Sequence, residues 1–182
     1  VLHRALQRLR DQPAEPLSET RQRILAAELL SMRHRGVGLA PDVQSAFNTS
    51  SERLAALSTQ FSNHVLDATQ QWTLMLRDPE QVAGLPPRAL DALAAAAREA
   101  GETDATASSG PWLLGLDMPR YLPFLTHAEN RDLRETVYRA HVSRASDGDL
   151  DNRALIEEIL SLRTEQAERL GKVARERGMT CL

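Results

Sequence analysis

The sequence contains very little cysteine, no long apolar run and no excess of charge of one sign. Its single cysteine, Cys181, is the second-to-last of 182 residues. One cysteine can form neither a disulfide framework nor a cysteine zinc cluster within the chain, and it favours a reducing compartment. No stretch approaches the roughly 20 apolar residues that a membrane-spanning helix needs. The first six residues also lack the apolar core of a secretion signal.

The charge balance gives no electrostatic reason to expect nucleic acid or a membrane as a partner. There are 22 basic and 25 acidic residues, for a net charge of −3. Hydrophobic residues make up 42% of the chain, enough for a buried core in one medium domain or in part of a larger one. The chain begins without Met inside a helical pattern, which predicts that the natural start lies upstream.

Helix signals dominate the first 70 residues. Ser18 is placed to cap a helix that ends with basic residues before Gly36. Pro41 opens a second, longer helix, and Ser50 fills a gap in its apolar stripe. The short connection at 36–38 predicts that the two helices form an antiparallel hairpin. The apolar stripe consists of Val43, Phe47, Leu54, Leu57, Phe61, Val65 and Ala68.

The middle of the chain has a different pattern. Residues 72–76 and 112–116 are short apolar runs that begin with Trp and end at turn residues, which predicts two short, paired strands. Between them we expect a helix from Pro87 to Gly101 and a polar surface loop over 102–110. The two Trp side chains are expected to pack against the strands rather than to stack on a ligand.

Two further helices are predicted toward the C-terminus. Thr126 and Glu129 have the spacing of a capping box, which predicts a helix beginning there and running to Ala140. A last helix should begin at Asp151 or Asn152 and end at Gly171. The expected fold is therefore mainly α: a multi-helix bundle with an antiparallel helical hairpin and one minor two-stranded β element.

The sequence contains no recognisable catalytic or metal-binding motif. None of the five histidines is followed by Glu, so the H-E-x-x-H zinc motif is missing. His127 and His141 are 14 residues apart, close to four helical turns, which is too far to share a metal unless the chain folds back. The glycines at 36–38 follow a helix rather than a strand, unlike a phosphate-binding loop. No catalytic or metal-binding residue is therefore assigned, and substrate-binding residues stay unknown. The histidines are His3, His34, His64, His127 and His141.

Paired carboxylates and a glycosylation triplet receive structural interpretations. Glu157 and Glu158 are expected on a solvated helix face, and Asp149 and Asp151 near a helix cap. The triplet beginning at Asn48 fits the glycosylation pattern, but it lies in a predicted helix, so modification there is not expected.

Several strings resemble the oligopeptidase A branch of the thimet oligopeptidase family, whose members are zinc metallopeptidases. LSTQFSNHVLDAT at 57–69 and GPWLLGLD at 110–117 carry the resemblance first. RASDGDLDN at 144–152 looks most like the cyanobacterial and plant organellar members. The resemblance covers about residues 21–171, and its other matching segments, in order, are 121–123, 130–135, 138–140, 156–163 and 170–171.

The resemblance implies a largely helical architecture around a deep channel that admits short peptides. In this family the zinc ligands come from H-E-x-x-H and a downstream Glu, and the Glu of the motif acts as general base on metal-bound water. These residues lie further toward the C-terminus, so none is carried over to this chain. The chain itself is expected to hold no cofactor, whereas the full-length family holds zinc. The implied location is the cytoplasm, or the chloroplast or mitochondrion in a eukaryote.

These implications place residues 1–171 as the N-terminal helical region of an oligopeptidase, in itself an incomplete domain, and residues 172–182 as a divergent tail. The expected partners are short peptides, for the full-length family, and the remainder of the peptidase chain. The first hypothesis is a fragment of a zinc oligopeptidase that is inactive alone. The alternative is a non-catalytic helical interaction module derived from the same scaffold, so whether this chain is an enzyme is left open.

Overall fold

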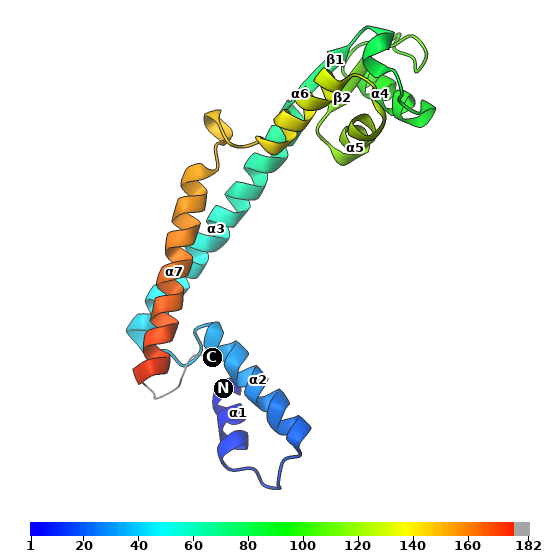
Figure 1. The fold of residues 1–182 in the computed structure, drawn as a ribbon. Coiled ribbons are helices and arrows are strands. Elements are labelled where there is room, and N and C mark those ends of the chain that lie inside the picture. Colours follow the sequence, from blue (N-terminus) through cyan, green and yellow to red (C-terminus); the bar gives the residue numbers. More distant parts are fainter. Residues whose placement is uncertain (177–182) are drawn as a thin grey trace. The chain divides into compact units, whose positions relative to one another are not determined.

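The computed structural model describes residues 1–176, which form seven α-helices, two short 3₁₀-helices and one two-stranded sheet (Figure 1). The mainly α fold with one minor strand pair is thus confirmed. Cys181 and the rest of 177–182, within the tail predicted to diverge, lie outside the described residues. The chain divides into two compact units, one made of residues 1–58 with the segment from Leu155 onward and the other of residues 59–154.

The first unit begins with a pair of packed helices, α1 (Leu2–Asp11) and α2 (Glu19–His34). Ser18 caps α2 as predicted, because its hydroxyl accepts a hydrogen bond from the main-chain N–H of Arg21 at 3.4 Å. Gly36 ends the helix with a φ of +79°, and a Cβ atom there would lie 2.7 Å from the ring of Phe47. Only glycine therefore suits this turn.

The long helix α3 (Pro41–Gln71) starts at the predicted proline, and α7 (Arg153–Glu176) runs antiparallel to its first half. Polar contacts join the two helices. Arg53 pairs with Glu158 at 2.6 Å, and Arg169 donates to Ser50 at 2.8 Å. An antiparallel hairpin was expected between α2 and α3, but the described contacts pair α2 with α1 and α3 with α7. Both glycines of the connection have positive φ values.

Helix α7 does not end where the sequence suggested. It continues past Gly171 to Glu176. A glycine ends a helix when it adopts a left-handed conformation, and Gly171 is not among the residues with positive φ. The predicted stop at Gly171 is therefore wrong.

The second unit is built around a small sheet. β1 (Thr73–Leu76) pairs antiparallel with β2 (Trp112–Gly115), with Leu76 opposite Trp112, which confirms the predicted strand pair. The 3₁₀-helix η1 (Pro79–Val82) and the helix α4 (Pro87–Glu99) follow β1, and α4 packs on β2. The largest fully buried side chains of this core are Trp112, Leu76, Leu93, Leu114, Leu116, Phe124 and Val137.

Two helices, α5 (Met118–His127) and α6 (Arg131–Val142), stand where one helix from Thr126 was predicted. The capping box is wrong: the hydroxyl of Thr126 donates to the carbonyl of Leu122 in the last turn of α5. Asn130 caps α6 instead, accepting from the N–H of Leu133 at 3.0 Å. His127 and His141 consequently lie on different helices.

Candidate functional site

The loop between α6 and α7 has an unusual backbone. Ala145 has a φ of +56°, a left-handed conformation that a residue with a Cβ seldom adopts, and Gly148 has a φ of +60°. Gly148 opens the second 3₁₀-helix, η2 (Gly148–Leu150). The side chain of Ala145 is buried, and its carbonyl accepts from the N–H of Asn152 at 2.9 Å. This closure holds the strained residue in place.

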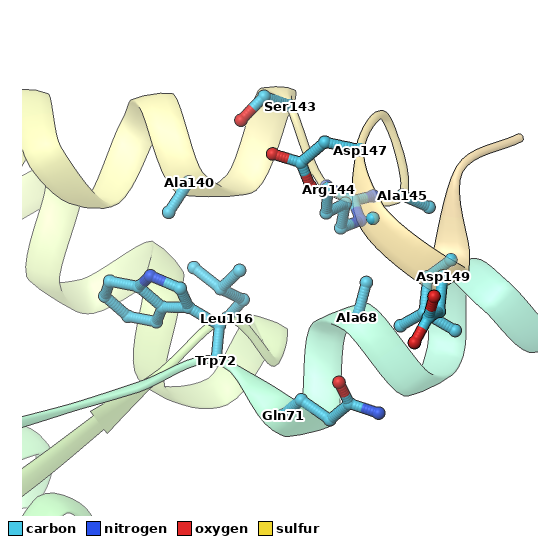
Figure 2. Close-up of a pocket in the computed structure, with 12 residues that line it drawn as sticks. Ala68, Gln71, Trp72, Leu116, Ala140, Ser143, Arg144, Ala145, Asp147 and Asp149 are labelled. Atoms are coloured by element: carbon cyan, nitrogen blue, oxygen red, sulfur yellow. The ribbon is translucent and has the colours of Figure 1, made fainter. Parts of the chain in front are cut away.

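The loop forms one wall of an open cleft of about 580 Å³ in the second unit (Figure 2). The opposite wall comes from the end of α3, from Trp72 and from Leu116. Figure 2 shows the indole of Trp72 and the side chain of Leu116 on one side of the space and Asp147 across from them. The lining residues are Ala68, Gln71, Trp72, Leu116, Ala140, Ser143, Arg144, Ala145, Asp147, Gly148, Asp149 and Leu150.

Asn152 fastens the end of the loop to α3. Its side-chain amide donates to the main-chain carbonyl of Phe61 at 3.1 Å, and the residue is only 3% exposed. Within the described residues, three buried polar atoms have no hydrogen-bond partner: Oδ1 of Asn152, Nε of Arg144 and Nδ1 of His64. Burying an unpaired donor or acceptor costs about 1–3 kcal/mol, so a hydrogen bond to any of these atoms would be favourable.

His141 stacks on Tyr121 beside the cleft. The ring centroids lie 4.0 Å apart and the planes differ by 15°. Burial lowers the pKa of the His141 imidazole, and the nearby positive charge of Arg144 lowers it further. Burial also raises the pKa of the Tyr121 phenol. The Nη1 group of Arg144 donates to the main-chain carbonyl of His141, so the guanidinium links this aromatic pair to the loop.

The cleft combines apolar side chains with exposed carboxylates of the loop. No three His, Cys, Asp or Glu side chains come together as a possible metal site anywhere in the part of the chain that the structure describes. No catalytic step is assigned to the described residues. Likewise, within residues 1–176, none of the helices has the length and apolarity to cross a membrane.

The structure places the other residues considered from sequence at separate positions. Glu158 is half-buried and paired with Arg53, whereas Glu157 is exposed. Asp151 accepts from the N–H of Arg153 at 2.9 Å, at the start of α7, which matches its expected role near a cap. Ser50, in the formal glycosylation triplet, is buried.

The histidines are dispersed as well. His3 lies next to Gly38, and His34 is exposed at the end of α2. His127 is exposed at the end of α5, whereas His64 and His141 are partly buried. Sequence reasoning did not foresee the stack of His141 on Tyr121. Spacings of three and four residues predict contacts between side chains on the same helix. They give no information about a contact between two helices such as α5 and α6.

The two tryptophans differ in role. Trp112 packs in the core at 1% exposure, and its indole N–H donates to the carbonyl of Ala107 at 3.2 Å. This agrees with the expected strand packing. Trp72 precedes β1 and borders the cleft, which the sequence did not indicate.

Comparison with known proteins identifies the family. The model for peptidase family M3 matches residues 124–175, which include α6, the loop and most of α7. A probable cytosolic oligopeptidase A of Arabidopsis thaliana is 46% identical over 171 residues, covering 93% of this chain and 24% of the relative. An organellar (chloroplastic/mitochondrial) oligopeptidase A of the same plant is 45% identical, covering 93% and 22%. Oligopeptidase A of Escherichia coli K12 is 39% identical, covering 93% and 25%.

The chain spans about a quarter of the length of the curated relatives that it matches. The three oligopeptidases are 39–46% identical to the chain over 93% of its residues, whereas the family model matches only residues 124–175. The cleft loop at 144–152 lies inside both. The chain belongs to peptidase family M3, as a segment of the oligopeptidase A type.

Proposed function

We propose that this chain is helical scaffold from the N-terminal half of a zinc-dependent oligopeptidase that hydrolyses short peptides when full length. Residues 1–171 would form an incomplete domain of that enzyme, and residues 172–182 a divergent tail. The observation that carries the proposal is the 39–46% identity to oligopeptidases A over 93% of the chain.

The exposed apolar side chains support an assignment to a larger molecule. In the second unit, Met118, Leu122 and Tyr138 are each more than half exposed. In the first unit, Ile156 and Leu160 are exposed on α7 at positions four residues apart, so they share one helix face. The remainder of the peptidase would cover such faces, because isolated domains rarely leave contiguous apolar surface in water.

We place the parent enzyme in the cytoplasm, or in the chloroplast or mitochondrion if its source is a eukaryote. The zinc ion and its ligands would belong to the remaining part of the enzyme, and this chain alone would be inactive. Its role would be to build and support the wall of a peptide-binding channel. Neither nucleic acid nor a membrane is proposed as a partner.

A segment exchange tests this function. The matched segment of the Escherichia coli oligopeptidase A would be replaced by residues 1–171, and cleavage of a quenched fluorescent short peptide would be followed. We expect chelator-sensitive cleavage by the exchange protein and none by the isolated chain. A matched control carries Gln in place of the Glu in the host's H-E-x-x-H motif, which should abolish cleavage. Chelator-sensitive cleavage by the purified 182-residue chain would contradict the proposal.

The second candidate is a non-catalytic helical interaction module. It is favoured by the buried core of residues 59–154, which includes Trp112 and Phe124 and would allow this unit to fold without further chain. This candidate predicts a monodisperse chain that does not bind a hydrophobic dye, whereas the fragment predicts dye binding. A folded chain that binds no dye, together with an inactive exchange protein, would favour the module.

A further inference from the structure

The loop between α6 and α7 contains a chemically reactive pair of residues, Asp147 and Gly148, at the wall of the cleft. It is the only Asp–Gly pair in the 182 residues, and the sequence contains no Asn–Gly pair. A protein chain rearranges most readily at such pairs, because glycine has no side chain to shield its amide nitrogen from the acidic or amide side chain before it. Both residues are exposed.

Neither reacting group is held by another part of the described chain. The carboxylate of Asp147 does not cap η2, and it makes no hydrogen bond or ion pair within the described residues. The main-chain N–H of Gly148 likewise donates to no other described group. A carbon atom added to Gly148 would meet nothing within 4 Å, so the space beside its backbone is open. The nitrogen and the carboxyl group are therefore both available to react.

The backbone at this pair has to rotate before the two groups can meet. Asp147 is extended, with φ −152° and ψ 172°, so its Cα–C bond must turn to bring the nitrogen of Gly148 to the carboxyl carbon. Gly148 has a φ of +60° and, as a glycine, accepts such rotations over a wider range than other residues. It is restrained by a long hydrogen bond, from the N–H of Asp151 to its carbonyl at 3.3 Å.

We propose that Asp147 is a site of spontaneous isoaspartate formation in the folded chain, and that this modification opens the loop. The amide nitrogen of Gly148 attacks the carbon of the protonated side-chain carboxyl group. A C–N bond forms, a C–O bond breaks, and the amide proton leaves with the hydroxyl as water.

Water then opens the resulting five-membered imide. Cleavage of its C–N bond on the side-chain side restores Asp147. Cleavage on the main-chain side gives isoaspartate, in which the chain continues through the former side-chain carboxyl group and the former main-chain carboxyl group becomes the free carboxylate. One water molecule leaves and one returns, so mass and oxidation state do not change and water is the only co-reactant.

Isoaspartate adds one carbon to the main chain inside the closed loop. The hydrogen bond from the N–H of Asn152 to the carbonyl of Ala145, at 2.9 Å, spans the modified residue. Ala145 keeps its left-handed φ of +56° only because its surroundings hold it there. The longer path between the two ends should break this bond and release Ala145, which changes the wall of the cleft. The inference goes beyond the proposed function and does not depend on it.

Storage of the 182-residue chain for several weeks at neutral pH in heavy-oxygen water tests the reaction. Peptide mass spectrometry should find one heavy oxygen and isoaspartate at Asp147, well above the level at Asp104, an exposed aspartate followed by Ala. Gly148→Ala should slow the reaction about tenfold, or about 1.4 kcal/mol in activation free energy. Asp147→Glu would need a six-membered imide and should remove the product. Asp149→Glu, the same change at another exposed carboxylate of the loop, is the matched control and should leave the rate unchanged.

Three results would overturn the proposal. The first is an Asp147 that takes up no more heavy oxygen than Asp104, a comparison that the unmodified sequence decides without any variant. The second is a folded Gly148→Ala variant that reacts at the original rate. The third concerns the loop: amide hydrogen exchange at Asn152 should be faster in the separated isoaspartate form than in the original chain, and unchanged protection would show that the loop stays closed. Circular dichroism verifies that each variant is folded.

Discussion

The amide of Asn152 donates a hydrogen bond to the main-chain carbonyl of Phe61, a residue 91 positions earlier in the sequence, at 3.1 Å. The bond fastens the end of the loop after α6 to the middle of α3. The main-chain N–H of Asn152 also donates a hydrogen bond to the carbonyl of Ala145, which closes the loop. One buried residue thus determines both the shape of the loop and its attachment to the helix, and it is part of the RASDGDLDN string.

Replacement of Asn152 by Ala should destabilise the unit of residues 59–154. The change removes the bond to Phe61 and leaves a small cavity at a site only 3% exposed. A buried hydrogen bond contributes about 0.5–1.5 kcal/mol and the cavity adds to the loss, whereas removal of the unpaired Oδ1 of Asn152 offsets part of it, so we expect a net loss of about 1 kcal/mol in the free energy of unfolding. Urea unfolding followed by Trp fluorescence measures it. Asp149→Ala, at an exposed position of the same loop, should change stability by less than about 0.5 kcal/mol.

Gly84 should tolerate alanine much less well than Gly101. Both have positive φ values, +86° and +105°. A Cβ on Gly84 would overlap the main-chain carbonyl oxygen of His127, whereas a Cβ on Gly101 would meet no atom within 4 Å. Gly101→Ala should therefore cost about 1 kcal/mol from backbone strain alone. Gly84→Ala should cost at least about 2 kcal/mol, because η1 and the end of α5 must move apart.

Thermal unfolding of the two alanine variants checks this difference. Equal melting temperatures for the two variants would show that the segments around Gly84 and His127 are not in the close contact that the structure gives them. Gly101→Ala serves as the matched control, because it introduces the same methyl group at a similarly strained position.

Signals that act within a few residues predicted the local structure well. The cap at Ser18, the first-turn Pro41 and the strand pair all depend on near neighbours or on short apolar runs, and all are present. Helix α5 was missed because Pro119 and Pro123 resemble helix breakers. Pro119 lies in the first turn, where its missing N–H costs nothing, and burial of Phe124 compensates for Pro123 within the helix.

Contacts between distant segments could not be predicted. The cleft joins Trp72 to a loop about 70 residues later, and periodicity within one helix carries no information about such a contact. The partner of α3 is a second example. A short glycine-containing connection usually folds one helix back on the next, yet α7, from the other end of the chain, packs on α3. The family resemblance drew attention to the sequence of residues 144–152, but a sequence match does not indicate the backbone geometry of this loop.

The stability of the second unit should fall as the pH falls below about 6.5. Burial and the charge of Arg144 lower the pKa of His141 in the folded chain, so the unfolded chain binds this proton more readily. The contribution of neutral His141 to the free energy of unfolding is therefore fully present above the pKa of the unfolded chain, about 6.5. This contribution is lost as the pH falls through the lower pKa of His141 in the folded chain. His141→Phe keeps an aromatic ring against Tyr121 but cannot be protonated, and it should flatten this part of the pH dependence.

Melting temperatures of the original chain and the His141→Phe variant between about pH 7.5 and pH 5 measure this effect. His34→Gln, a change at an exposed histidine in the other unit, is the control and should leave the slope unchanged. If His141→Phe retains the full slope, another group must dominate the pH dependence.

Ser50 should be more sensitive to enlargement than its neighbour Thr49. Ser50 is 6% exposed; its hydroxyl donates to the carbonyl of Ala46 at 3.0 Å and accepts from Arg169 on α7 at 2.8 Å. Leucine at this position would remove the acceptor for Arg169 and force α3 and α7 apart. Overpacking a close contact costs about 1–3 kcal/mol, and we expect Ser50→Leu to lie in that range. Among the described residues, the hydroxyl of the exposed Thr49 donates only to the carbonyl of Ser45 in the same helix, so Thr49→Leu should change stability by less than about 0.5 kcal/mol.

Limited proteolysis of α7 provides a local readout for the Ser50 prediction, beside urea unfolding. Because α7 is held against α3 by polar contacts in the described chain, loss of the Ser50–Arg169 bond should expose α7 to cleavage before the rest of the first unit. Ser50→Ala removes the same acceptor without added volume, so it separates the two effects. A Leu variant that is cleaved no faster than the Ala variant would attribute the loss to the hydrogen bond alone, whereas faster cleavage would show that the spacing between the helices is set by the small side chain at position 50.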